Sequence, residues 1–96
     1  MLDYTDASLL KEIGGRIRTM RNERQLSLRD LAFKIGMEPS NLSVIENGKS
    51  NPQLLTYAKI AGALQLSLKE LFDFDFNFEA FFDQAPTYVP RKHEKG

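Results

Sequence analysis

Apolar residues recur at steps of three and four over most of this chain, which is the spacing of helices that bury one face. Nothing in the first 72 residues alternates with the two-residue period of a strand. Because the connections between the periodic segments are brief, we predict an all-α body of five short helices packed on one core. The predicted helices cover residues 8–22, 28–35, 39–47, 52–65 and 68–72.

The same spacing identifies the side chains expected to form the core. In the first helix they lie opposite charged residues such as Arg16 and Arg18. Gly14 and Gly15 weaken this helix, since each glycine costs roughly 1 kcal/mol relative to alanine. The expected core side chains are Leu9, Ile13, Ile17, Met20, Leu28, Leu31, Ala32, Ile35, Leu42, Ile45, Leu54, Tyr57, Ala58, Ile60, Ala61, Leu64, Leu68, Leu71 and Phe72.

Short polar residues mark where two of these helices begin. Ser27 followed by Asp30 has the pattern of a capping box, in which each side chain accepts a hydrogen bond from the other residue's backbone amide. The same pattern recurs at Ser67 and Glu70. Asn51 is expected to cap the fourth helix, with Pro52 in its first turn.

Residues 28–47 are predicted to be two short helices joined by a tight turn at Gly36, with a second glycine, Gly48, at the far end. Two helices joined in this way are the arrangement that places one of them in the major groove of DNA. The outward side of the second helix is small, uncharged or hydrogen-bonding, which lets it lie close against another surface. Its residues are Pro39, Ser40, Asn41, Ser43, Val44 and Asn47.

Further motifs occur in a fixed order over residues 13–72. They are Ile17-Arg18-x-x-Arg21, Leu31-Ala32, Gly36, Ile45-Glu46-Asn47-Gly48, Asn51-Pro52, Ala63-Leu64 and Leu71-Phe72. In order and spacing they resemble the phage repressor and Cro-like (Xre-type) helix-turn-helix regulators. The resemblance implies a five-helix DNA-binding domain over residues 8–72, with the helix-turn-helix at 28–47. It further implies a sequence-specific transcriptional regulator, a repressor that binds double-stranded operator DNA as a dimer through helix 39–47.

The resemblance assigns base contacts to the outward face of that helix. Pro39, Ser40, Ser43 and Val44 stand at positions that commonly meet base edges. None of them is Arg, Lys or Gln, so bidentate guanine contacts are not expected there, whereas the two apolar residues suit thymine methyl groups. Asn41 is expected to pair with adenine.

Phosphate contacts are expected just beyond the helix. Asn47, Lys49, Ser50 and Asn51 combine amide and hydroxyl donors with one fixed charge. Arg29, near the start of the preceding helix, is expected to reach a phosphate or a guanine.

The resemblance also implies a buried ion pair between Arg21 and Glu46, which ties the first helix to the end of the third. Removing one partner of a fully buried pair typically costs about 3–5 kcal/mol, because the remaining charge is left unpaired. We therefore interpret this pair as structural.

Charge is balanced overall but unevenly distributed. The chain has 13 basic and 13 acidic residues, and a formal charge of zero at pH 7. Residues 11–49 hold eight basic and five acidic residues, whereas residues 70–83 hold five acidic and no basic ones. Because phosphate neutralisation supplies much of DNA affinity, we expect a basic face near Arg29 and Lys49, opposite an acidic carboxyl-terminal face, and modest binding.

Composition argues against several other classes. The 96 residues suit one domain, and they include no cysteine and no apolar run of about eighteen residues. Neither disulfides nor a membrane span is predicted, and a cytoplasmic protein is expected. His93 is the only histidine, and no phosphate-binding glycine loop or paired carboxylates of catalytic spacing occur. We predict no enzyme activity, no metal and no cofactor.

Residues 73–96 form an extension for which the pattern leaves alternatives open. Four rings alternate with acidic or amide residues, which is the two-residue period of a short strand. These rings are Phe72, Phe74, Phe76 and Phe78. They would cover the helical body, pair with the same segment of a second chain, or bind a partner protein. A second spacing fits a helix instead: Phe74, Phe78, Phe81 and Phe82.

Dimerisation is expected to involve this aromatic region, Phe72–Phe82, because a twofold dimer places two reading helices in successive major grooves roughly 34 Å apart. The alternative function is a protein-interaction module, an antitoxin or anti-regulator, whose acidic aromatic extension binds a basic partner. Beyond it, Pro86 and Pro90 predict an extended arm, followed by a loose polar tail at 91–96.

Overall fold

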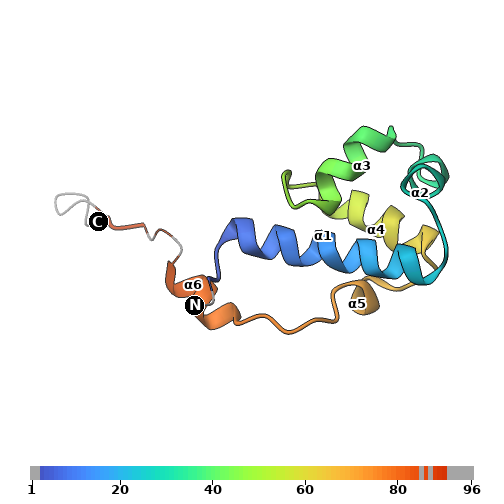
Figure 1. Ribbon diagram of the computed structural model, residues 1–96. Helices are drawn as coiled ribbons and strands as arrows, with labels where there is room; N and C mark the ends of the chain where they lie inside the picture. The colour runs from blue at the N-terminus through green and yellow to red at the C-terminus, as the bar shows by residue number, and fades with distance from the viewer. Residues whose placement is uncertain (1–2, 85, 87, 91–96) are drawn as a thin grey trace.

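The computed structural model describes residues 3–84, 86 and 88–90, and within them it contains helices and no strand. The helices are α1 (Asp6–Glu23), α2 (Leu28–Lys34), α3 (Pro39–Glu46), α4 (Leu54–Ala63), α5 (Leu68–Leu71) and α6 (Phe78–Gln84). Figure 1 shows α1 as the long central helix, with α3 and α4 on one side of it and α5 on the other. The all-α prediction is confirmed, with a sixth helix added to the expected five.

Side chains from α1 to α5 meet in one buried core. In it α1 packs against α3 and α5, α2 against α3 and α4, and α4 against α5. The buried apolar residues are Ile13, Ile17, Met20, Leu31, Ala32, Leu42, Ile45, Tyr57, Ile60, Ala61, Leu64 and Leu71, all of them predicted. Six others expected inside are only half-buried, and most lie within one turn of a helix end. They are Leu9, Leu28, Ile35, Ala58, Leu68 and Phe72.

The fourth helix begins later than the sequence predicts. Its N-cap is Gln53, whose backbone is extended with φ −68° and ψ 155°. The predictions of Asn51 as cap and Pro52 in the first turn are therefore wrong. The buried face of α4 starts only at Tyr57, so its first turn projects beyond the core. As a result Leu54, predicted to be buried, is 61% exposed.

Both predicted capping boxes are present. The Ser27 hydroxyl accepts from the Asp30 amide over 2.9 Å, and the Asp30 carboxylate accepts from the Ser27 amide over 3.0 Å. Ser67 and Glu70 exchange the same two bonds, over 3.0 and 2.8 Å. The backbone amide of each serine lowers the pKa of its partner carboxyl, because the bond favours the charged form.

Four helices end in the same left-handed turn. Gly36 after α2 and Gly48 after α3 have φ values of 68° and 70°, as their sequence positions predict. Gln25 and Gln65 adopt φ values of 57° and 62° after α1 and α4. This conformation lets the next backbone amides bond to the last helical carbonyls, which ends the helix and keeps the connection short.

The segment after α5 is extended but forms no strand. Phe72, Phe74 and Phe76 are half-buried and the residues between them are exposed, so the predicted alternation persists in a single unpaired segment. The ring of Phe72 packs edge-on against Tyr57, with centroids 5.6 Å apart, and Phe74 packs at the edge of the core. These contacts correspond to the alternative in which the rings cover the helical body.

The chain becomes helical again at Phe78, as the second spacing allowed. The Asn77 side chain caps this start by accepting from the Ala80 amide over 3.0 Å. Figure 1 shows α6 beside the N-terminal end of α1, at the opposite end of that helix from α2. The rings of Phe76 and Tyr4 pack there with centroids 5.0 Å apart.

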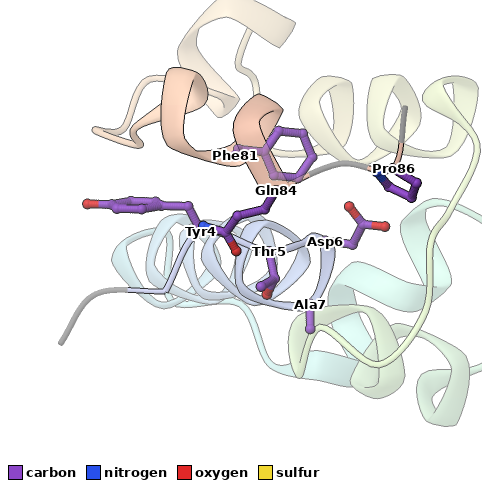
Figure 2. Close-up of a pocket in the computed structure, with 7 residues that line it drawn as sticks. All are labelled: Tyr4, Thr5, Asp6, Ala7, Phe81, Gln84 and Pro86. Carbon is purple, nitrogen blue, oxygen red and sulfur yellow. The ribbon is translucent and has the colours of Figure 1, made fainter. Parts of the chain in front are cut away.

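A pocket of about 270 Å³ lies between α6 and the start of α1 (Figure 2). Its lining comes from both ends of the described chain: Tyr4, Thr5, Asp6, Ala7, Phe81, Gln84 and Pro86. Two rings of α6 are largely exposed, Phe78 by 54% and Phe82 by 71%. Residues 88–90 of the predicted arm are exposed as well, whereas the predicted tail at 91–96, including His93, lies outside the described residues.

Candidate nucleic-acid interface

The outer face of α3 is available for contact because its inner face is fixed to the body. Leu42, Ile45 and Glu46 are buried. At about 100° per residue, the side of the helix opposite them is centred on Ser40 and Val44. Both are exposed, Val44 by 40%. The helix therefore presents short side chains outward, as the sequence predicts.

The ten predicted contact residues all reach the surface, on α3, on the turn after it and at the start of α2. The exposed ones are Arg29, Ser40, Asn41, Val44, Asn47, Lys49 and Asn51. The half-buried ones are Pro39, Ser43 and Ser50. Their contacts with bases and phosphates stay predictions.

Asn41 lies towards one edge of this face. It lines a pocket of about 370 Å³ that also involves Glu38 at the start of α3, and Thr56 and Lys59 on α4. The centre of the outer face, by contrast, contains Ser40 and Val44. The adenine contact of Asn41 stays a prediction, at the edge of the face rather than at its centre.

A buried ion pair fixes the end of α3 to α1. Two nitrogens of the Arg21 guanidinium lie 2.8 and 3.0 Å from the two carboxylate oxygens of Glu46. The side chain of Glu46 is 1% exposed and that of Arg21 12%. Their hydrogen bonds raise the pKa of Arg21, which keeps the charge in place, and Arg21 also donates to the Leu26 carbonyl over 2.9 Å. This confirms the pair implied by the family resemblance.

A second arginine of α1, Arg18, is exposed as predicted, and its guanidinium reaches the same region. The Arg18 guanidinium donates to Asn47 Oδ1 over 2.7 Å, and its Nε lies 3.4 Å from Glu46 Oε1. The available signal was its position three residues before Arg21, because residues at that spacing share one side of a helix.

Two glycines allow α1 to approach the end of α3 closely. A Cβ atom at Gly14 would overlap the carbonyl oxygens of Ile45 and Glu46, and one at Gly48 would lie 2.5 Å from Lys11 Cα. Gly14 appeared in the sequence as a weak point of the first helix. In the structure it is the residue that permits the crossing of α1 and α3.

The positive charge at the candidate interface is smaller than the sequence count suggests. Arg16 donates to the carbonyls of α5 and Arg24 to the Leu64 carbonyl, so both stabilise the body. The exposed cations on and around this face include Arg18 on α1, Arg29 at the start of α2 and Lys49 after α3. The Arg29 guanidinium lies 5.9 Å above the ring of Phe33 on the same helix.

Other kinds of site are not apparent in residues 3–84, 86 and 88–90. No group of three or more His, Cys, Asp or Glu side chains is placed to hold a metal ion in that part of the chain. None of the helices described there has the length and apolar character needed to cross a membrane.

Two short helices joined by a tight glycine turn, the second with an exposed polar face, define a helix-turn-helix protein. The helix-turn-helix family model matches residues 17–71, and the chain belongs to this family. The matched residues include α2, α3 and the Arg21–Glu46 pair, so the resemblance deduced from the motifs is confirmed.

Named relatives match this chain over part of its length. The chain is 40% identical over 62 residues to the HTH-type transcriptional regulator SinR of Bacillus subtilis, across 64% of this chain and 56% of SinR. It is 37% identical over 59 residues to the immunity repressor protein of Bacillus phage phi105, across 62% of this chain and 41% of the repressor. The matches thus span about half the length of these two relatives.

A solved structure has the same fold over most of the body. The restriction-modification controller protein C.AhdI of Aeromonas hydrophila superposes with a TM-score of 0.63 and is 37% identical. The superposition covers 68% of this chain and 97% of C.AhdI.

Proposed function

We propose that this protein is a sequence-specific DNA-binding transcriptional regulator that inserts α3 into the major groove of operator DNA. The observation that carries the proposal is the outer face of α3, which is exposed, short and free of acidic groups while its inner face is anchored. A major groove about 12 Å wide admits an α-helix, and short side chains on its outer face let the helix axis approach the base edges closely. The relatives SinR, a transcriptional regulator, and the phage immunity repressor support a regulator over a protein-interaction module.

Within this proposal the base contacts come from Pro39, Ser40, Ser43 and Val44, with Asn41 at the edge. Serine hydroxyls discriminate weakly between bases, so much of the specificity comes from apolar contact with thymine methyl groups and from DNA shape.

The phosphate backbone is held on both sides of that face. The proposed anchors are Arg29 at the start of α2 and the turn residues Asn47, Lys49, Ser50 and Asn51. Because only two of these five carry a fixed charge, we expect a shallow dependence of affinity on salt.

The proposal includes a homodimer that acts as a repressor, since two linked copies can read both halves of a palindromic operator. From the sequence, the dimer contact is expected within Phe72–Phe82. We now assign that contact to α6, because Phe72, Phe74 and Phe76 already pack against residues of their own chain. The exposed rings of Phe78 and Phe82 support this role, since one helical turn separates them and they share one side of α6.

The DNA-reading face is tested by placing negative charge on it. The double variant Ser43→Glu with Val44→Glu is expected to abolish specific binding in a DNA titration and to leave the circular dichroism spectrum unchanged, because both positions are outside the core. The control adds two charges at exposed positions elsewhere, with Thr19→Glu on α1 and Gln25→Glu just after it, and is expected to retain specific binding. Retained affinity in the α3 variant would refute the assigned face.

The dimer surface is tested with two equally exposed apolar residues. Phe82→Asp on α6 is expected to raise the monomer fraction in analytical ultracentrifugation, whereas Leu55→Asp on α4, where Leu55 is 70% exposed, is expected to leave it unchanged. An unchanged dimer in the α6 variant, or a monomer produced only by the α4 variant, would remove α6 from the interface.

A further inference from the structure

A chain of hydrogen bonds runs from α1 to the outer face of α3. Arg18 donates from a terminal guanidinium nitrogen to Asn47 Oδ1 over 2.7 Å. Asn47 in turn donates from Nδ2 to the Ser43 hydroxyl oxygen over 3.5 Å. Arg18 is itself held by Glu46, whose Oε1 lies 3.4 Å from the arginine Nε. A residue outside the helix-turn-helix therefore fixes a side chain at the end of the proposed reading helix.

The orientation of the Asn47 amide decides what it offers to a phosphate. One end of the amide carries two N–H donors and the other a carbonyl acceptor. A phosphate oxygen accepts hydrogen bonds, so it is attracted by Nδ2 and repelled by Oδ1. Because a guanidinium has only donors, Arg18 binds Oδ1 and directs Nδ2 towards Ser43 and the exposed face. The bond to Ser43 uses one of the two Nδ2 hydrogens, which leaves the second for an incoming anion.

We propose that Arg18 is a positioning residue for DNA binding, which holds the Asn47 amide with its donors towards the phosphate backbone. The inference rests on the proposed function and deepens it by naming the residue that sets one phosphate anchor. Arg18 acts through Asn47 because two of its guanidinium nitrogens are already engaged by Glu46 and Asn47. A direct phosphate contact by Arg18 is the competing explanation.

A double-mutant cycle separates the two roles. Arg18→Met keeps the length of the side chain and removes its donors and charge, and Asn47→Ala removes the amide. If Arg18 acts by positioning Asn47, Arg18→Met is expected to weaken DNA binding about fivefold when Asn47 is present. In the Asn47→Ala background the same change is expected to weaken binding by less than about twofold, because the effects of coupled residues are not additive. Equal losses in both backgrounds would overturn the proposal.

The salt dependence gives a second readout. The slope of log K against log salt is negative, and loss of a direct phosphate contact reduces its magnitude by about 0.9. Loss of positioning in the Asn47→Ala background leaves the slope unchanged. Lys11→Met is the control, since it removes one charge from an exposed residue of the same helix. It is expected to have the same effect in both Asn47 backgrounds.

The orientation can also be measured without DNA. In the wild-type protein the Asn47 side-chain amide is expected to give one resolved pair of NMR signals with restricted motion, and Arg18→Met is expected to increase that motion. An amide equally ordered in both proteins would overturn the positioning role. If the wild-type protein binds no duplex DNA, the proposed function fails and the inference fails with it. If the wild-type protein binds DNA but the effects of Arg18→Met and Asn47→Ala are additive, the positioning role fails and the proposed function stands.

Discussion

The helical body and the extension after it use apolar side chains in opposite ways. In the body, Ile17, Leu31 and Leu42 have no exposed surface. In α6 no residue is buried, and Phe82 is 71% exposed. Because a short helix is stabilised mainly by the surface it buries, α6 depends on few contacts with the body. The apolar side chains of α1 to α5 therefore form the core of the fold, whereas those of α6 leave apolar surface available for another molecule.

The largest loss of stability is expected when the buried ion pair of the body is broken. Glu46→Ala leaves Arg21 unpaired in a mostly buried position, so the free energy of unfolding is expected to fall by about 3–5 kcal/mol in urea denaturation. Glu79→Ala on α6 is expected to change it by less than about 0.5 kcal/mol, since that side chain is on the surface. Similar losses in the two variants would contradict the division into body and extension.

A smaller effect is expected from removing helix caps on either side of the boundary. Ser67→Ala removes the cap of α5, which holds Leu71 in the core, and is expected to cost about 1 kcal/mol of unfolding free energy. Asn77→Ala removes the cap of α6. It is expected to leave global unfolding nearly unchanged while increasing amide hydrogen exchange within α6. If the second variant destabilised the whole protein as much as the first, α6 would belong to the cooperative core.

Much of the body could be predicted because its signals are local. The serine caps at Ser27 and Ser67 and the left-handed glycines Gly36 and Gly48 act through neighbouring backbone groups, so their sequence positions are enough. The predicted start of α4 was wrong because the start depends on where Tyr57 meets the core. The residues near Asn51 carry no signal for that contact.

The site shows the same limit. The Arg21–Glu46 pair could be expected from the family motif, but the contact of Arg18 with Asn47 and the need for Gly14 both come from the close crossing of α1 and α3. No local pattern reports such a crossing. The extension was ambiguous because short aromatic runs fit two periods, and its structure depends on which rings find a partner surface.

The smallest expected effect is a dependence of the body's stability on pH. The pKa values of Asp30 and Glu70 are lowered in the folded protein, so both carboxylates add stability above their ordinary values of 3.8 and 4.5. That contribution is lost as the pH falls through the lowered folded values. The double variant Asp30→Asn with Glu70→Gln is expected to be less stable than wild type near neutral pH and to approach it in acid, as measured by thermal unfolding. A stability difference between variant and wild type that grows as the pH falls would contradict this prediction.

Selection of bound sites from random duplex DNA, at stated salt, tests the central claim most directly. The account predicts enrichment of a twofold-symmetric sequence whose half-sites are roughly 34 Å apart, and loss of that enrichment with Ser43→Glu and Val44→Glu. A folded wild-type protein that enriches no sequence, or a variant that enriches the same one, would contradict the claim that α3 reads DNA.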